Sequence, residues 1–251
     1  MRGAATTVAA AMVRLAVGVR AFSTSAPGAG GAGGGVSMVQ GASRGIGLEF
    51  VRQLLRRSEQ GRVVATCRAP DSAPELLKLK EEHAPGRLTV LPLDVTDEST
   101  IEAAATKIGE THGSLDLLIN ASGILSIPNV LQPVTKTISV EFGRKDNIAC
   151  ILLHPGTVDT DLSRPFQRNV PKGKLFTREF SVQKLLSVID NAKKSDNGKF
   201  FAWDGQEIPW IRYGARPVYK SCSDRDITDS TCSTRKSEII SLDVLLTQIM
   251  R

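Results

Sequence analysis

The sequence lacks the marks of several large classes of protein. No apolar run approaches the roughly 20 residues that a membrane-spanning helix needs, so we predict no membrane span. The four cysteines have no metal-ligand spacing, and Cys67 and Cys150 lie in apolar, strand-like runs where buried reduced thiols are expected. A metal centre is therefore not predicted.

Acidic residues are absent from the start of the chain, and the first is Glu49. The net charge of +6 is partly a property of this region, because Arg2, Arg14 and Arg20 all precede that residue. Positive charge gathered at one terminus is a weak indication of nucleic-acid binding, and we predict no nucleic-acid partner. The hydrophobic content of 41% is typical of a globular protein.

Residues 1–25 combine arginine, alanine and hydroxyl residues without any acid or lysine. This composition is typical of a mitochondrial transit peptide rather than a secretory signal. It predicts that the protein is located in the mitochondrial matrix. The alternative is an alanine-rich start that carries no address, in a cytoplasmic protein. Residues 27–35 read as a glycine-rich linker, so residues 1–35 form a presequence with its linker. Gly28, Gly30 and Gly33 fit a dinucleotide-binding pattern, but no strand precedes them.

From residue 36 onward, strand-like and helix-like segments alternate. The expected strands are residues 36–40, 62–68, 87–95 and 115–120, and the intervening helices include one capped by Asp71 or Ser72. This alternation predicts an α/β fold with a Rossmann-like, doubly wound parallel sheet covered on both faces. Ligands of such sheets bind beyond the carboxyl ends of the strands.

The residues after the first two strands predict a phosphate-binding site. Gly41 and Gly45 would let the backbone approach a pyrophosphate, and the following helix would offer unpaired N–H groups to it. Arg68 stands where NAD-selective folds carry an acid for the ribose 2′-hydroxyl, and Arg44 lies in the glycine loop. Two cations there favour a 2′-phosphate and therefore NADP(H).

Four motifs in order resemble the short-chain dehydrogenase/reductase family, in its carbonyl-reductase-like branch typified by C-factor and sniffer. They are the Gly-x-x-x-Gly-x-Gly loop, "LDVTD" (93–97), "NASG" (120–123) and "HPGTVDTDL" (154–162), followed by the closing segment "GKFFAWDGQEIPW" (198–210). The resemblance covers residues 36–210 and implies an NAD(P)-binding Rossmann domain. The implied activity is that of an NADPH-dependent carbonyl reductase acting on a small-molecule carbonyl substrate.

The resemblance also implies which residues hold the cofactor. The phosphates would be lined by Gly41, Ser43, Arg44, Gly45, Ile46 and Gly47; Arg68 would select NADP, and Asp94 and Val95 would flank the adenine. Asn120, Ala121 and Ser122 would pass near the ribose, and Pro155, Gly156 and Thr157 would meet the nicotinamide.

The family's proton-donating tyrosine, with a lysine four residues later, has no counterpart in the chain. Its two tyrosines, Tyr213 and Tyr219, are followed at that spacing by Pro217 and Ser223. Between "NASG" and "HPG" stand only residues 124–153, which are too few for the family's fifth strand, catalytic serine and tyrosine helix. We therefore predict an internal deletion near residues 126–135 and no catalytic residue. Lys136 is too close to Pro155 to be the family's lysine, and we predict a solvated helix residue there.

The deletion has consequences for the rest of the chain. We expect an incomplete sheet, in which the family's sixth strand docks against the fourth. An oligomer of this chain with copies of itself or with intact family members stays an open alternative. Residues 211–251 do not resemble the family, and we predict disorder with a short amphipathic helix near the end, or sequence without a selected structure. Three readings of the whole chain stay open: an impaired reductase, a catalytically dead NADP-binding isoform and an unstable splice product.

Overall fold

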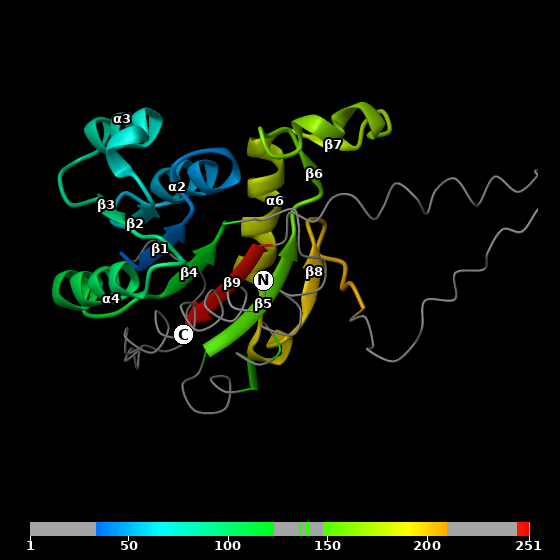
Figure 1. Ribbon diagram of the computed structural model, residues 1–251. Helices are drawn as coiled ribbons and strands as arrows, with labels where there is room; N and C mark the ends of the chain where they lie inside the picture. Colours follow the sequence, from blue (N-terminus) through cyan, green and yellow to red (C-terminus); the bar gives the residue numbers. More distant parts are fainter. Residues whose placement is uncertain (1–33, 123–135, 137–138, 141–147, 210–244, 251) are drawn as a thin grey trace, which may run out of the picture.

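The computed structural model describes residues 34–122, 136, 139–140, 148–209 and 245–250, which form an α/β fold (Figure 1). Seven strands form the main sheet in the order β3-β2-β1-β4-β9-β5-β8, and β6 and β7 pair separately. The strands are β1 (Val36–Gln40), β2 (Arg62–Cys67), β3 (Leu88–Pro92), β4 (Leu117–Asn120), β5 (Ile148–His154), β6 (Thr157–Val158), β7 (Leu175–Phe176), β8 (Phe200–Ala202) and β9 (Leu245–Met250). The α-helices described in full are α2 (Gly45–Arg57), α3 (Pro74–Glu82), α4 (Glu98–His112) and α6 (Arg178–Asn191).

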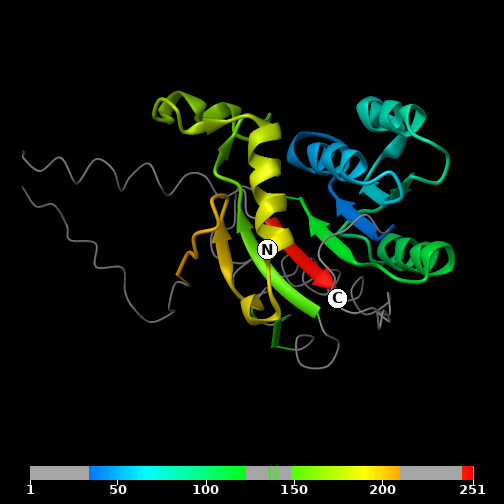
Figure 2. The same cartoon turned by 180° about the vertical axis from the view of Figure 1, so that it is seen from behind.

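Helices cover the two faces of this sheet, as the alternating sequence predicts. One buried cluster joins the sheet to α2, α3 and α6 through side chains such as Leu48, Leu76 and Leu185. A second cluster on the other face joins it to α4 through Ile101 and Ile108. Figure 2 shows α6 lying across the sheet beside α2. The doubly wound, Rossmann-like class is confirmed.

Strands β3, β2, β1 and β4 are parallel, and their positions follow the predicted strands with small changes at the ends. The strand expected over 87–95 ends at Pro92. The predicted cap by Asp71 or Ser72 is wrong, because both residues lie in a 3₁₀ turn and α3 begins after Ala73 without a side-chain cap. Pro74 explains this boundary, since a proline disfavours helical backbone in the residue before it.

The end of the chain differs most from expectation. Residues 245–250 form strand β9, not a helix, and β9 lies antiparallel between β4 and β5 (Figure 1). The sixth strand of the family pattern, here β5, therefore does not dock against β4. Short apolar runs fit a strand and a helix equally well, and the pairing partners available in the fold decide between them.

Several predictions fall outside the described residues. They are the presequence, the deletion near 126–135 and the disorder of the tail before residue 245. Within the part of the chain that the structure describes, no helix combines the length and the apolar character that crossing a bilayer requires.

Candidate cofactor-binding site

A cavity of about 540 Å³ opens beyond the carboxyl ends of the parallel strands. Of the predicted cofactor residues, eleven line it: Gly41, Ser43, Arg44, Gly45, Ile46, Gly47, Arg68, Asp94, Val95, Ala121 and Ser122. The remaining lining residues were not predicted: Gln40, Leu48, Cys67, Glu75, Thr96, Asp159, Thr160, Asp161, Leu162, Arg164 and Arg178. The fold thus gathers residues from the ends of five strands around one hollow.

The glycine loop has a backbone that side chains would obstruct. Gly41 and Gly45 have φ angles of +82° and +61°, in the left-handed region that favours glycine. A Cβ on Gly47 would stand 2.2 Å from the carbonyl oxygen of Gly41, so the third glycine permits close packing of the loop on its own helix. This geometry explains the spacing of the three glycines.

The amino end of α2 differs from the amino ends of the other long helices. Asp97 accepts a hydrogen bond from the N–H of Ser99 at the start of α4, and Thr177 accepts one from Phe180 at the start of α6. Helix α2 begins after Arg44 without a side-chain cap, and no acid lies in its first turn. Its first N–H groups therefore remain available for an anion in the cavity.

Arg68 and Asp94 lie close together at the ends of β2 and β3. Asp94 accepts hydrogen bonds from the backbone N–H and the hydroxyl of Thr96, at 2.9 and 2.7 Å. These two bonds, the backbone one first, lower the pKa of Asp94; burial opposes them, and the positive charge of Arg68 adds a smaller lowering. The carboxylate of Asp94 therefore stays ionised near the guanidinium.

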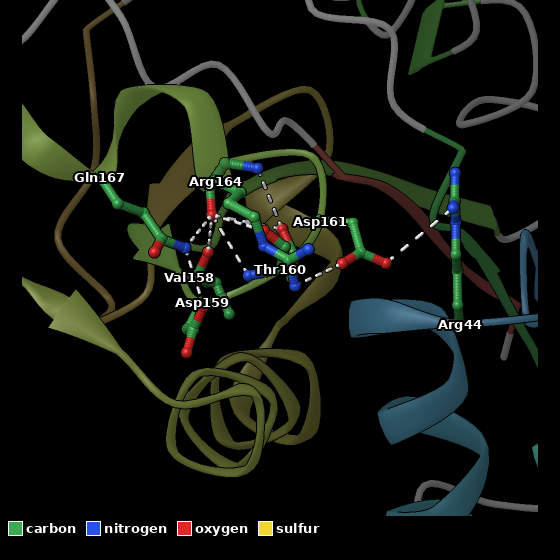
Figure 3. A network of polar contacts seen from close by, with 8 residues as sticks. Arg44, Val158, Asp159, Thr160, Asp161, Arg164 and Gln167 are labelled. Carbon is green, nitrogen blue, oxygen red and sulfur yellow. Dashed lines mark hydrogen bonds and ion pairs between the residues drawn. The ribbon is translucent and has the colours of Figure 1, made fainter.

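The loop after β6 forms the opposite wall of the cavity (Figure 3). Its centre is the buried hydroxyl of Ser163, which donates to the carbonyl oxygen of Val158 at 2.5 Å and accepts from Nε2 of Gln167 at 3.0 Å. Asp161 pairs with Arg164 at 2.9 Å and reaches Arg44 of the glycine loop at 4.0 Å. This loop therefore meets the glycine loop across the cavity.

Pro155, Gly156 and Thr157, expected at the nicotinamide, are not among the residues that line the cavity. The carbonyl oxygen of Pro155 accepts a hydrogen bond from Ser181, and Thr157 belongs to β6. A Cβ on Gly156 would stand 2.6 Å from the ring of Phe176, which packs on Trp203 with ring centroids 4.6 Å apart. The Pro-Gly turn is thus packed under aromatic side chains.

Asn120 also lies outside the lining, buried at the end of β4. Its register partner on β1 is Gln40, which pairs in turn with Thr66 on β2. All three side chains are at least nine-tenths buried, and each has a polar atom without a hydrogen-bond partner among the residues that the structure describes. Buried polar groups of this kind are normally satisfied by protein, ligand or water. One of the three, Gln40, lines the cavity.

Lys136 lies away from the cavity. Its side chain is exposed, and its Nζ comes within 3.3 Å of the position of a Cβ on Gly198, which precedes β8 at the amino edge of the sheet. The exposed side chain agrees with the prediction of a solvated helix residue. The two tyrosines of the sequence lie outside the described residues.

Comparisons with known proteins agree with this class of fold and site. Residues 36–137 match the short chain dehydrogenase family. An uncharacterised oxidoreductase of Schizosaccharomyces pombe is 26% identical over 251 residues, covering 70% of this chain and 98% of the relative. The benzil reductase of Saccharomyces cerevisiae is 34% identical over 106 residues, covering 42% of this chain and 36% of that protein.

Solved structures show the same relationship. The NADPH-bound carbonyl reductase from chicken fatty liver superposes with a TM-score of 0.64 at 27% identity, covering 72% of this chain and 96% of its own. The carbonyl reductase Sniffer of D. melanogaster shares the fold, with a TM-score of 0.58 at 18% identity over 71% of this chain and all of its own. Fold and cavity together are similar to those of Rossmann-like oxidoreductases. The segment 36–137 belongs to the short-chain dehydrogenase/reductase family, and the fold as a whole is similar to that of carbonyl reductases.

Proposed function

We propose that this chain binds NADP(H) through the adenosine and phosphate half of the cofactor and is impaired in carbonyl reduction. The observation that carries the proposal is the cavity itself, because its lining unites the uncapped amino end of α2 with Arg44 and Arg68. An uncapped helix end suits a pyrophosphate, and paired guanidinium groups suit a 2′-phosphate. The solved relative from chicken carries NADPH, which supports this choice of cofactor.

The charges of the lining assign separate roles to its residues. Arg44 is 77% exposed and is held only loosely by Asp161, so its guanidinium is free to turn towards a bound phosphate. Asp94 stays ionised and suits the acceptance of a hydrogen bond from the adenine amino group. Bound NADPH would supply a hydride, and the chain's own residues would bind and orient its phosphates.

The proposed impairment rests on the proton donor, because the family's tyrosine would lie beside the hydride of NADPH. The sequence has no tyrosine with a lysine four residues later, and its tyrosines fall at 213 and 219, beyond the segments that resemble the family. A carbonyl reduction needs a proton donor as well as a hydride. The alignment with the S. pombe relative supports a deletion, since it extends over 251 positions yet includes only 70% of this chain, or about 176 residues.

Cofactor titrations of matched variants test the binding proposal. We expect NADPH to bind more tightly than NADH, and Arg68→Ala to weaken NADPH about tenfold with little effect on NADH, because one charge-assisted bond to the 2′-phosphate is lost. Arg56→Ala is the control, since Arg56 is exposed in the last turn of α2 and does not line the cavity. Equal loss for both cofactors, or no binding of NADPH, would overturn the proposal.

The mitochondrial address stays a separate proposal, carried by the composition of residues 1–25. A fluorescent protein fused after residue 35 checks it. We expect matrix fluorescence, and its loss when Arg14 and Arg20 are replaced by glutamate; diffuse cytoplasmic signal from the unaltered segment would contradict the address.

A further inference from the structure

Strand β9 occupies a central place in the sheet, although it comes from the tail that does not resemble the family. It pairs with β5 over six residues, from Leu245 opposite Leu153 to Met250 opposite Ile148. It also pairs with β4 over four, from Leu246 opposite Asn120 to Ile249 opposite Leu117. Both neighbours run antiparallel to it, whereas the pairs of the sheet that do not include β9 are all parallel.

The spacing of the sheet shows what β9 does for its neighbours. Adjacent strands lie about 4.8 Å apart, so β4 and β5 are separated by roughly twice that distance and cannot pair with each other. Without β9, both would present unpaired backbone groups along edges that now lie inside the sheet. Residues Ile148 to Leu153 of β5 are all buried, so this would occur in the core.

The two strands that β9 joins lead directly to the two walls of the cavity. Strand β4 continues into Ala121 and Ser122, on the side of the glycine loop. Strand β5 continues through the Pro-Gly turn into the loop of Asp161, on the opposite side. The width of the cavity is therefore set in part by the strand between β4 and β5.

We propose that the space between β4 and β5 is a strand-binding groove whose ligand is the segment 245–250 of the same chain. In the family pattern this place belongs to the fifth strand, which we predict to be deleted from this chain. The tail segment fills it in the opposite direction, completes the sheet and holds the two walls of the cavity together. This inference does not rest on cofactor binding.

The register gives a direct test, because Gln248 lies opposite the native Cys150 of β5. Opposite residues of an antiparallel pair have Cα atoms about 4.5–5.5 Å apart, which is within the range that disulfides span. In a chain with Cys222→Ser and Cys232→Ser, mild oxidation of Gln248→Cys should form a disulfide with Cys150 inside one chain. Peptide mapping by mass spectrometry identifies the linked pair.

Thr247→Cys in the same background is the matched control. Position 247 lies opposite Ile151, and successive residues face opposite sides of a sheet, so it should not link to Cys150. Equal linkage at 247 and 248, or none at 248, would overturn the proposal. A covalent dimer that joins Cys150 to the introduced thiol of another chain would also overturn it, because the ligand would then be the segment of a second copy.

A second pair of variants tests the consequence for the fold in the full chain. Thr247→Pro removes a ladder hydrogen bond from a strand that is paired on both sides, and should lower the melting temperature by about 5–10 °C. Ser230→Pro is the control in the same tail and should leave the melting temperature unchanged. Equal melting temperatures for both variants would contradict the role of β9, whether or not NADPH binds.

Discussion

The half of the fold formed by residues 34–122 and the half formed by residues 148–209 are built in different ways. In the first, β1 to β4 form one parallel sheet, in which β2 pairs with β1 and β3, and β4 pairs with β1. In the second, β5 pairs with β8 and with β9, a strand that begins 36 residues after the second half ends at residue 209. Local sequence patterns predict the first half. The second half pairs with β9, a segment that those patterns predict to be a helix in the tail.

Breaking the glycine loop should have the largest effect on the first half. In Gly47→Ala the new Cβ would meet the backbone carbonyl of Gly41 at 2.2 Å, so the loop must shift. We expect a loss of about 2–3 kcal/mol in the free energy of unfolding, together with loss of NADPH binding. Chemical denaturation and fluorescence titration measure the two effects.

Gly109→Ala is the matched control for that variant. Gly109 lies inside α4, and a Cβ there would meet nothing within 4 Å. Alanine in a helix interior should stabilise the protein by about 0.5–1 kcal/mol and leave NADPH affinity unchanged. If both variants were destabilised equally, the close contact between Gly47 and the carbonyl oxygen of Gly41 would not explain the loss of stability.

Lowering the pH should also weaken the first half, at a point away from the cavity. Burial and the nearby charge of Arg62 lower the pKa of His112 below its ordinary 6.5, and its ring nitrogens are buried with no hydrogen-bond partner in the described part of the chain. The unfolded chain therefore binds the proton more readily than the folded one. Stability should be unaffected by this group above pH 6.5 and fall as the pH drops below it.

His112→Leu isolates that contribution. Thermal melts between pH 8 and pH 5, values chosen about the ordinary histidine pKa, should show a smaller loss for the variant than for the parent chain. Parallel curves would contradict the account. The affinity for NADPH should not follow His112, because this residue does not line the cavity and Asp94 there stays ionised.

The smallest expected effect concerns an ion pair that links the halves. Arg57 of α2 and Asp190 of α6 lie 2.7 Å apart, with side chains 37% and 51% exposed. A double-mutant cycle with alanine at both positions should give a coupling of about 0.2–1 kcal/mol that decreases in high salt. A coupling energy well above this range would contradict the small contribution that we expect from this ion pair to the contact between the two halves.

The sequence predicted the first half well because its signals are local. The alternation of segments, the glycines at positive φ and Arg68 beyond β2 are each recognisable within a few residues. The loop around Asp161 was missed as a wall of the cavity, because Arg44 meets it only after folding. Strand β9 was missed because the spacing of Leu242, Leu245, Leu246 and Ile249 fits a helix, and only the open place between β4 and β5 selects a strand.

The central claim is that the chain binds NADPH but does not reduce a carbonyl substrate with it. One measurement tests this claim directly. The purified chain is first saturated with NADPH while the fluorescence of NADPH is followed. A reactive dicarbonyl is then added, and the absorbance of NADPH is followed. We expect a saturable change in NADPH fluorescence, followed by a loss of NADPH absorbance no faster than in a protein-free control. Turnover of NADPH above that control would contradict it.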